Sequence, residues 1–448
     1  MNNGLKTTIK QLTPAVLTSL IATSLGLLSL FTSKVPMIQD FGMMLAIGIA
    51  VAFVMALFIL LPFLTLRTKL HDDVPQKKTV KPSVYTKILR KFARGILKGK
   101  YVILVVAVLL TAAGFYVDQD VGVETDFETF MPQDSEALTD IHELRDIVGS
   151  TDRIVILYES SDISSYDTLS EIDALTKAVQ SEYPNDIEMI GSVTLLLDQV
   201  SSNSWDDTTL DTYLEQLPQD QLKMLLSTET NQGIINIALS DMDDDAFAMF
   251  LTALEDTILS LELSTTVTVT GQSVVDQAML EAMTSDRLMM TLIGIGLVFV
   301  ALLLIYRNLF KALIAVLPII FIVGWSGGIM YLFGFDYTPL TSTLGALIIG
   351  IGTEFTILIL MRYYELKRSQ SHQESIVDSV GLMGKPIIVS ALTTMGGFSA
   401  LIFSDFQILS NFGIMTVINL ALALISALVV LPALIAVMGN QAKTLASD

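Results

Sequence analysis

Long apolar runs alternate with short polar segments over most of the chain. A helix needs about 20 mostly apolar residues to cross the hydrocarbon core of a bilayer. Eight runs meet or approach this length, three before and five after a long acidic segment. These are residues 14–31, 41–66, 101–117, 288–306, 312–333, 338–363, 386–403 and 412–438. The pattern predicts a polytopic α-helical membrane protein with eight spans.

The segment between the third and fourth spans has a different pattern, in which alternating stretches are interleaved with helical ones. The predicted strands are residues 152–159, a stretch within 187–197, 233–240 and 264–270. The predicted helices are residues 165–183 and 244–261, with a helical insertion over 206–227. The order strand–helix–strand, insertion, strand–helix–strand predicts a ferredoxin-like α+β domain.

The net charge of −20 is concentrated in that same segment. About 35 of the 46 acidic residues lie between residues 120 and 286, together with only four Lys or Arg. Such a block repels nucleic acid and anionic surfaces. Most of the other Lys and Arg residues fall on one side of an eight-span path, above all in residues 67–100. The positive-inside rule therefore predicts a cell-membrane protein with both termini cytoplasmic and the acidic domain extracytoplasmic.

Residues 85–100, within the basic segment, have two faces when they are arranged as a helix. The apolar face carries Tyr85, Ile88, Leu89, Phe92, Ile96 and Leu97, and the basic face carries Lys87, Arg90, Lys91, Arg94 and Lys98. This pattern predicts an amphipathic helix that lies in the inner membrane interface.

Residues 14–64 and 386–434 form an internal repeat. Pro14, Phe41, Gly42 and Pro62 recur in the same order as Pro386, Phe412, Gly413 and Pro432. Tandem halves of this kind are common in transporters. A domain and three further spans precede the second copy, whereas thirteen residues precede the first. We therefore expect the C-terminal two-thirds of a two-half protein, with the rest removed or supplied by another chain.

The predicted organisation has six parts. They are two spans that end the first transmembrane half (1–66), a basic cytoplasmic linker with the interfacial helix (67–100), a single span (101–118), the acidic extracytoplasmic domain (119–286), a five-span bundle (287–438) and a cytoplasmic tail (439–448).

Glu354 is a single carboxylate near the middle of the sixth predicted span. At a rise of about 1.5 Å per residue it lies roughly 12 Å from Arg362, where the cytoplasmic edge is expected. An acid near the bilayer centre costs about 2.5–3.5 kcal/mol on insertion scales, so such residues are usually functional. A carboxyl that is neutral when dry and charged when wetted can couple proton flow to motion. The alternative is a structural acid that hydrogen-bonds for helix packing.

Nearby hydroxyl side chains are candidate proton-coupling partners of Glu354. They are Thr353, Thr356, Ser390, Thr393 and Thr394. Ser and Thr in membrane helices also bond to carbonyls of their own helix, which is the structural alternative. Asn419, in the last span, is expected to hydrogen-bond between helices. Glycines at 345, 350, 352, 396 and 397 permit close helix approach.

Residues able to form a cofactor or metal site are lacking. The chain has no cysteine, and its three histidines are scattered over aqueous segments. The acidic run at 241–245 lacks the ligand spacing of a calcium loop. We therefore expect no cofactor, no metal and no enzyme active site.

Four stretches resemble the resistance-nodulation-division (RND) superfamily, in particular its hydrophobe-exporter branch near the mycobacterial large membrane proteins (MMPL). They are GIGTEFTILILMRYYE at 350–365, SALTTMGGFSALIFSDFQILSNFG at 390–413, VETDFETFMPQDS at 123–135 and VTGQSVVDQAM at 269–279. The resemblance implies spans five to twelve of twelve, together with the second extracytoplasmic porter domain. It also implies proton-driven export of hydrophobic, amphiphilic or lipid-like molecules, with Glu354 in the position of the proton site on span ten.

The expected partners are a lipid-like substrate, membrane lipid, protons and a missing N-terminal half or partner chain, with assembly into an oligomer left open. Two other functions fit the same architecture. One is a lipid- or sterol-sensing receptor that binds without pumping. The other is an accessory factor for protein translocation, similar to the SecD/SecF pair.

Overall fold

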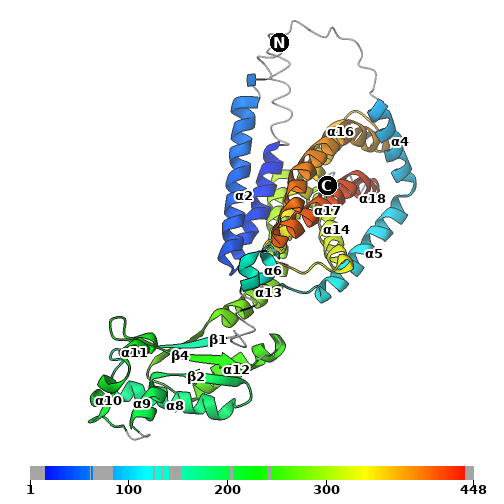
Figure 1. Cartoon of the computed structure of the whole chain (residues 1–448). Helices are drawn as coiled ribbons and strands as arrows, with labels where there is room; N and C mark the ends of the chain where they lie inside the picture. The colour runs from blue at the N-terminus through cyan, green and yellow to red at the C-terminus, as the bar shows by residue number, and fades with distance from the viewer. Residues whose placement is uncertain are drawn as a thin grey trace. The chain divides into compact units, whose positions relative to one another are not determined.

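The computed structural model describes residues 16–60, 62–63, 84–124, 127–133, 135–140, 143, 153–201, 205–240, 242 and 244–438. The chain divides into two compact units (Figure 1). The membrane unit comprises residues 1–132 and 281–448, and the α/β unit comprises residues 133–280.

The membrane unit is helical. Within the described ranges, seven helical segments are long and apolar enough to cross a membrane. They are α2 (Pro36–Met55), α5 with η3 (Lys100–Val117, Asp118–Asp120), the Arg287–Tyr306 part of α13 (Gln272–Tyr306), α14 (Leu309–Phe333), η4 with α15 (Thr341–Thr343, Leu344–Leu366), α16 with η5 (His372–Phe398, Ser399–Phe403), and α17, η6 and α18 (Gln407–Ile425, Ser426–Val430, Leu431–Met438). The first predicted span corresponds to a shorter apolar helix, Val16–Thr32. The chain is therefore a multi-pass helical membrane protein.

Helix α16 begins well before the predicted start of its span. It starts at His372, where the side chain of Ser371 accepts a hydrogen bond from the backbone N–H of Glu374. The hydroxyl of Ser371 in turn donates to the Glu374 carboxylate at 3.0 Å, which completes a cap at the helix start. Pro386, the predicted start of the span, lies inside the helix.

Helices α14 and α15 form the centre of the membrane unit. Two-thirds (67%) of the residues in their apolar windows are buried inside the protein, compared with 11% for α2. The largest apolar cluster takes most of its buried residues from these two helices and from α16 and α17, with others from α13 and α18, and includes Ile319, Ile322, Ile357 and Leu360. The conspicuous acid Glu354 therefore lies on one of the two most enclosed helices.

The internal repeat is confirmed by matching contacts in the two copies. A Cβ atom on Gly42 would lie 2.8 Å from the Cβ of Leu30, and one on Gly413 would lie 2.8 Å from the Cβ of Leu401. Each glycine lies twelve residues after its partner leucine, so both hairpins close through the same contact. A 3-10 segment precedes each glycine (η1, Ser29–Thr32, and η5), and a π-helical segment follows it (η2, Ala56–Leu60, and η6). The rings of Phe41 and Phe412, which are equivalent in the repeat, meet edge to face at 5.8 Å.

The α/β unit contains one antiparallel sheet with strand order β2-β4-β1-β5, and β3 pairs with β4. Its strands are β1 (Arg153–Glu159), β2 (Ile187–Gly191), β3 (Leu226–Ser227), β4 (Gln232–Leu239) and β5 (Thr266–Thr270). Its helices are α8 (Tyr166–Glu182), α9 (Val193–Ser201), α10 (Leu210–Gln216), α11 (Gln219–Leu225) and α12 (Asp244–Ser260). The predicted strands and helices are all present in the predicted order, with α10 and α11 in the insertion.

One face of the sheet carries the core of the α/β unit. Alternate residues of β1 and β4 are buried, as expected for strands with one covered face. Ile154, Ile156 and Ile237 lie on that buried face. They belong to one apolar cluster with Ile172 of α8 and Leu254 of α12, both of which are fully buried. Helices α8 and α12 therefore cover the same face of the sheet.

Glu171 of α8 ties this helix to the residues before β5. Its carboxylate accepts hydrogen bonds from the backbone N–H groups and hydroxyls of Ser264 and Thr265, at 2.7–3.2 Å. Partial burial acts to raise the pKa of Glu171, but these hydrogen bonds outweigh it and lower the pKa below the ordinary 4.5. The ionised carboxylate is therefore the form that holds β5 in place.

Replacement of Glu171 by Gln is expected to weaken this attachment by about 1 kcal/mol, because charge-assisted hydrogen bonds become neutral ones. Hydrogen exchange of the peptide that covers residues 261–270, measured in the full chain at neutral pH, should become faster. In the wild type the contribution is complete above pH 4.5 and is lost as the pH falls through the lowered pKa. Glu188→Gln, an exposed change on β2, is the control, and equal exchange in both variants would contradict the prediction.

Asp118, Arg287 and Tyr337 form a cluster at one end of the membrane unit. The Arg287 guanidinium donates to both carboxylate oxygens of Asp118, at 2.8 and 3.3 Å, and to the Tyr337 hydroxyl at 2.7 Å. The Tyr337 hydroxyl donates to Asp118 at 2.6 Å, and the guanidinium lies 3.9 Å from the centre of the Tyr337 ring. The cluster joins the end of α5, the span of α13 and the segment after α14.

Asp118→Asn is expected to destabilise the membrane unit by about 2–3 kcal/mol, somewhat less than for a fully buried pair, because Arg287 keeps its charge without a counter-charge. The midpoint of thermal unfolding in detergent should fall. The double variant Asp118→Asn/Arg287→Gln should lose less than the sum of the two single variants, because the two residues interact directly. If the loss of stability in the double variant equals the sum of the two single losses, the ion pair contributes nothing to the stability of the membrane unit.

Candidate functional site

Glu354 lies on α15 among buried residues, and its own side chain is half-buried. The adjacent Thr353 and Phe355 are 0% and 2% exposed. Among the residues that the structure describes, none forms a hydrogen bond or ion pair with the Glu354 carboxyl. The position thus combines an ionisable group with an apolar surrounding and, within the described part of the chain, no counter-charge.

Four of the five predicted hydroxyl partners donate to carbonyls of their own helices. Thr353 donates to the carbonyl of Gly350 at 2.6 Å, and Thr356 donates to that of Gly352 at 2.8 Å. On α16, Thr393 donates to Val389 at 2.8 Å and Thr394 to the carbonyl of Ser390 at 3.0 Å. Ser390 and Thr393 are exposed, whereas Thr353 and Thr356 are buried. The structure therefore brings none of these hydroxyls into a hydrogen bond with Glu354, and their relay role stays a prediction.

Asn419 was expected to hydrogen-bond between helices, but it forms no such bond among the described residues. Its side chain is 4% exposed, and neither amide atom has a hydrogen-bond partner in the described part of the chain. It lines a cavity of about 10 Å³ together with Leu347 and Ile351 of α15. A cavity of this size is at the lower limit for one water molecule. Ile351 lies three residues before Glu354, so this polar group borders the helix face on which the acid lies.

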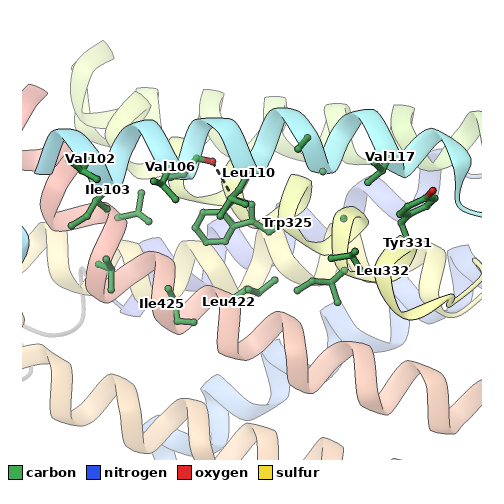
Figure 2. Close-up of a pocket in the computed structure, with 17 residues that line it drawn as sticks. Val102, Ile103, Val106, Leu110, Val117, Trp325, Tyr331, Leu332, Leu422 and Ile425 are labelled. Carbon is green, nitrogen blue, oxygen red and sulfur yellow. Dashed lines mark hydrogen bonds between the residues drawn. The ribbon is translucent and has the colours of Figure 1, made fainter. Parts of the chain in front are cut away.

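A large apolar groove lies elsewhere in the membrane unit, between α5, α14 and the segment formed by α17 and η6 (Figure 2). We call it the α5–α14 groove, and its volume is about 680 Å³. Its lining is Val102, Ile103, Val106, Ala107, Leu110, Ala113, Gly114 and Val117 of α5, Trp325, Gly328, Ile329, Tyr331 and Leu332 of α14, and Leu422, Ile425, Val429 and Val430. The lining contains no charged side chain, and the Trp325 indole N–H donates to the carbonyl of Ala107 at 3.3 Å.

The groove suits an apolar ligand. Pockets for small molecules commonly measure about 300–1,000 Å³ and are mostly apolar. The α5 residues that line it run from Val102 to Val117, which corresponds to roughly 22 Å along the helix. Sequence reasoning missed this groove, because its lining residues are ordinary apolar span residues from three distant segments.

Comparison with known proteins places the chain in a family. The family model described as "MMPL family" matches residues 153–447. A membrane protein of Methanocaldococcus jannaschii is 24% identical over 366 residues, which are 78% of this chain and 94% of that protein. The sulfolipid-1 exporter MmpL8 of Mycobacterium tuberculosis is 26% identical over 99 residues, 22% of this chain and 9% of that protein.

The fold also resembles a solved structure. The hedgehog release protein Disp from the water bear Hypsibius dujardini matches with a TM-score of 0.73 and 13% identity, over 97% of this chain and 59% of that one. The chain thus spans only part of Disp and of MmpL8. The family model covers about two-thirds of the chain, and the predicted resemblance to the MMPL branch of the RND superfamily is confirmed. The chain belongs to the MMPL family.

Proposed function

We propose that this chain takes part in proton-driven export of hydrophobic, amphiphilic or lipid-like molecules across the cytoplasmic membrane. The observation that carries the proposal is Glu354, a half-buried carboxyl on a central membrane helix with no partner among the described residues. The α5–α14 groove supplies a site for an apolar molecule. The named lipid export of MmpL8 supports the same class of cargo.

The proposed mechanism depends on the wetting of Glu354. In an apolar surrounding the neutral carboxyl is favoured, and access of water from one side favours release of the proton. If water reaches the acid from opposite sides of the membrane in two alternating states, each cycle moves a proton across the membrane and can drive a rearrangement of the helices. Thr353, Thr356, Ser390, Thr393 and Thr394 are the proposed relay hydroxyls, and they would have to leave their intrahelical bonds to act.

The proposed topology completes this scheme. It has eight spans, with Val16–Thr32 as the short first span, and both termini in the cytoplasm, as the positive-inside rule predicts. The α/β unit then lies outside the membrane as a ferredoxin-like porter domain along the path of the cargo. Its strand order β2-β4-β1-β5 and its two strand–helix–strand units support that assignment.

The test is reconstitution of the chain into liposomes that contain a phospholipid with a fluorescent acyl chain. Release of this lipid to albumin outside is measured with and without an imposed pH gradient. Export requires release that rises with the gradient and falls to background when a protonophore is added. Binding without gradient-dependent release would instead identify a receptor. Absence of both, with co-purification of a translocation channel, would identify a SecD/SecF-like factor.

A further inference from the structure

We propose that the α5–α14 groove binds an anionic amphiphile, with its acyl chain along α5 and its headgroup at Lys98 and Lys100. This inference deepens the proposed function, and it depends on that function only for the identification of the bound molecule as cargo. Three features of the membrane unit support it: the apolar groove, the two lysines close in sequence to the start of its lining, and the exposed apolar side of the helix that ends at Lys98.

The cations lie where the groove begins. Lys98 is the last residue of α4 (Val84–Lys98), and Lys100 is the first residue of α5. The groove lining starts at Val102, only two residues after Lys100. The Lys100 amine lies 3.5 Å from the Ala436 carbonyl oxygen and 5.0 Å from the centre of the Tyr101 ring. We infer that a ligand whose chain fills the groove has its polar end near the start of α5, within reach of these long lysine side chains.

Among the described residues, no carboxylate pairs with either amine. In the described ranges, neither Lys98 nor Lys100 forms an ion pair, whereas Arg90 on the same helix as Lys98 pairs with Asp378 at 3.0 Å. Helix α4 contains five Lys or Arg residues and no acid. Each basic residue near an anionic membrane surface contributes about 1 kcal/mol of attraction. The uncompensated positive charge at the groove end therefore favours a negatively charged headgroup.

The position of α4 fits a lipid headgroup region. Its buried residues, Ala93 and Ile96, face the protein, while Tyr85, Ile88 and Phe92 are 63%, 59% and 47% exposed. The predicted apolar face is thus divided between protein contact and an exposed side. Exposed apolar rings beside lysines are typical of a helix at a membrane interface. The lysines consequently lie at the depth of headgroups, and the groove extends into the hydrocarbon.

The length of the groove also distinguishes a bound amphiphile from a lipid of the surrounding bilayer. One leaflet of the hydrocarbon core is about 15 Å deep. The lining of α5 extends roughly 22 Å, so a seated chain would pass beyond the bilayer midplane. A second copy of the chain would cover the same surface with protein, but the lysines without carboxylate partners favour an anion as the occupant.

The experiment uses the full chain in zwitterionic nanodiscs with two photoreactive lipids. One is a phosphatidylglycerol and the other a phosphatidylcholine, with identical diazirine-bearing acyl chains. Labelled peptides of α5 and α14 are quantified by mass spectrometry after irradiation. We expect the glycerol lipid to label the groove at least about five-fold more strongly, which corresponds to about 1 kcal/mol for one lysine. Salt should reduce this preference.

Matched variants assign the preference to this site. Lys98→Gln/Lys100→Gln should bring the ratio of labelling by the two lipids close to one. Lys87→Gln/Lys91→Gln makes the same charge change farther along α4 and should leave this ratio at its wild-type value. Ala113→Trp fills the groove and should remove labelling by both lipids. Ala112→Trp, at an exposed residue of α5 outside the lining, should not.

Equal labelling by both lipids in the wild type, or a preference unchanged by Lys98→Gln/Lys100→Gln, would overturn the inference. Absence of labelling by both lipids in the wild type would also overturn it, because the groove would then be covered by something other than lipid, such as a second copy of the chain. The assay uses no pH gradient. A headgroup preference without gradient-driven release would therefore reject the export function alone, and release without the preference would reject this inference alone.

Discussion

Glu354→Gln is expected to reduce gradient-driven lipid release to the background measured with a protonophore. Glutamine has almost the same shape as the neutral acid and can hydrogen-bond in the same place, but it cannot bind and release a proton. The variant should therefore fold and reach the membrane while the coupling is lost. Release in reconstituted liposomes, with proton influx followed in parallel by an internal pH dye, measures both effects.

Two further variants make this result specific to the position. Glu354→Asp keeps a carboxyl and should retain part of the coupled release. Glu365→Gln removes an acid from the end of the same helix, where it pairs with Arg362, and should leave coupling intact. Undiminished proton-coupled release in Glu354→Gln would reject the assignment and favour a receptor or another proton site.

The sequence was sufficient to find Glu354 because an acid within a long apolar run is conspicuous by itself. Its surroundings required the structure. Thr353 and Thr356 are close in sequence, yet their hydroxyls satisfy carbonyls one turn earlier on the same helix. Asn419, expected to bond between helices, instead borders a small cavity. Spacing along one helix does not determine which neighbouring helix a side chain meets.

The glycines also show that spacing along one helix does not predict which residues pack against a neighbouring helix. The Phe-Gly pairs of the repeat were informative, because Gly42 and Gly413 each close a hairpin against a nearby residue of the same copy. The glycines at 396 and 397 were expected to permit close approach, but a Cβ on either would meet nothing within 4 Å. This prediction is wrong for the described residues, because those two glycines do not face a packed neighbour.

The tightest glycine contact was not predicted, because its two sides are far apart in the sequence. Gly114 of α5 meets α14 at Gly324 and Gly328, which are four residues apart and so share one helix face. Small residues at this spacing let two membrane helices approach closely. A Cβ on Gly114 would overlap the carbonyl oxygen of Gly324, and the Cα of Gly114 would lie 3.1 Å from a Cβ on Gly328.

Gly114→Ala is therefore expected to destabilise the membrane unit by about 3 kcal/mol, at the upper end for overpacking, because a backbone atom cannot move aside as a side chain can. The midpoint of thermal unfolding in detergent should fall. With Trp205→Phe as background, Trp325 is the only remaining tryptophan of the chain, and its emission should change as its hydrogen bond to Ala107 is strained.

Gly396→Ala is the matched control, since it adds the same methyl group to a membrane helix where nothing lies within 4 Å. Alanine is a better helix former than glycine by about 1 kcal/mol, so this variant should be at least as stable as the wild type. Both substitutions raise helix propensity, so a difference between them measures the steric contact at Gly114. Equal midpoints for Gly114→Ala and Gly396→Ala would show that α5 does not pack closely on α14, and the groove that depends on this packing would then have a different shape.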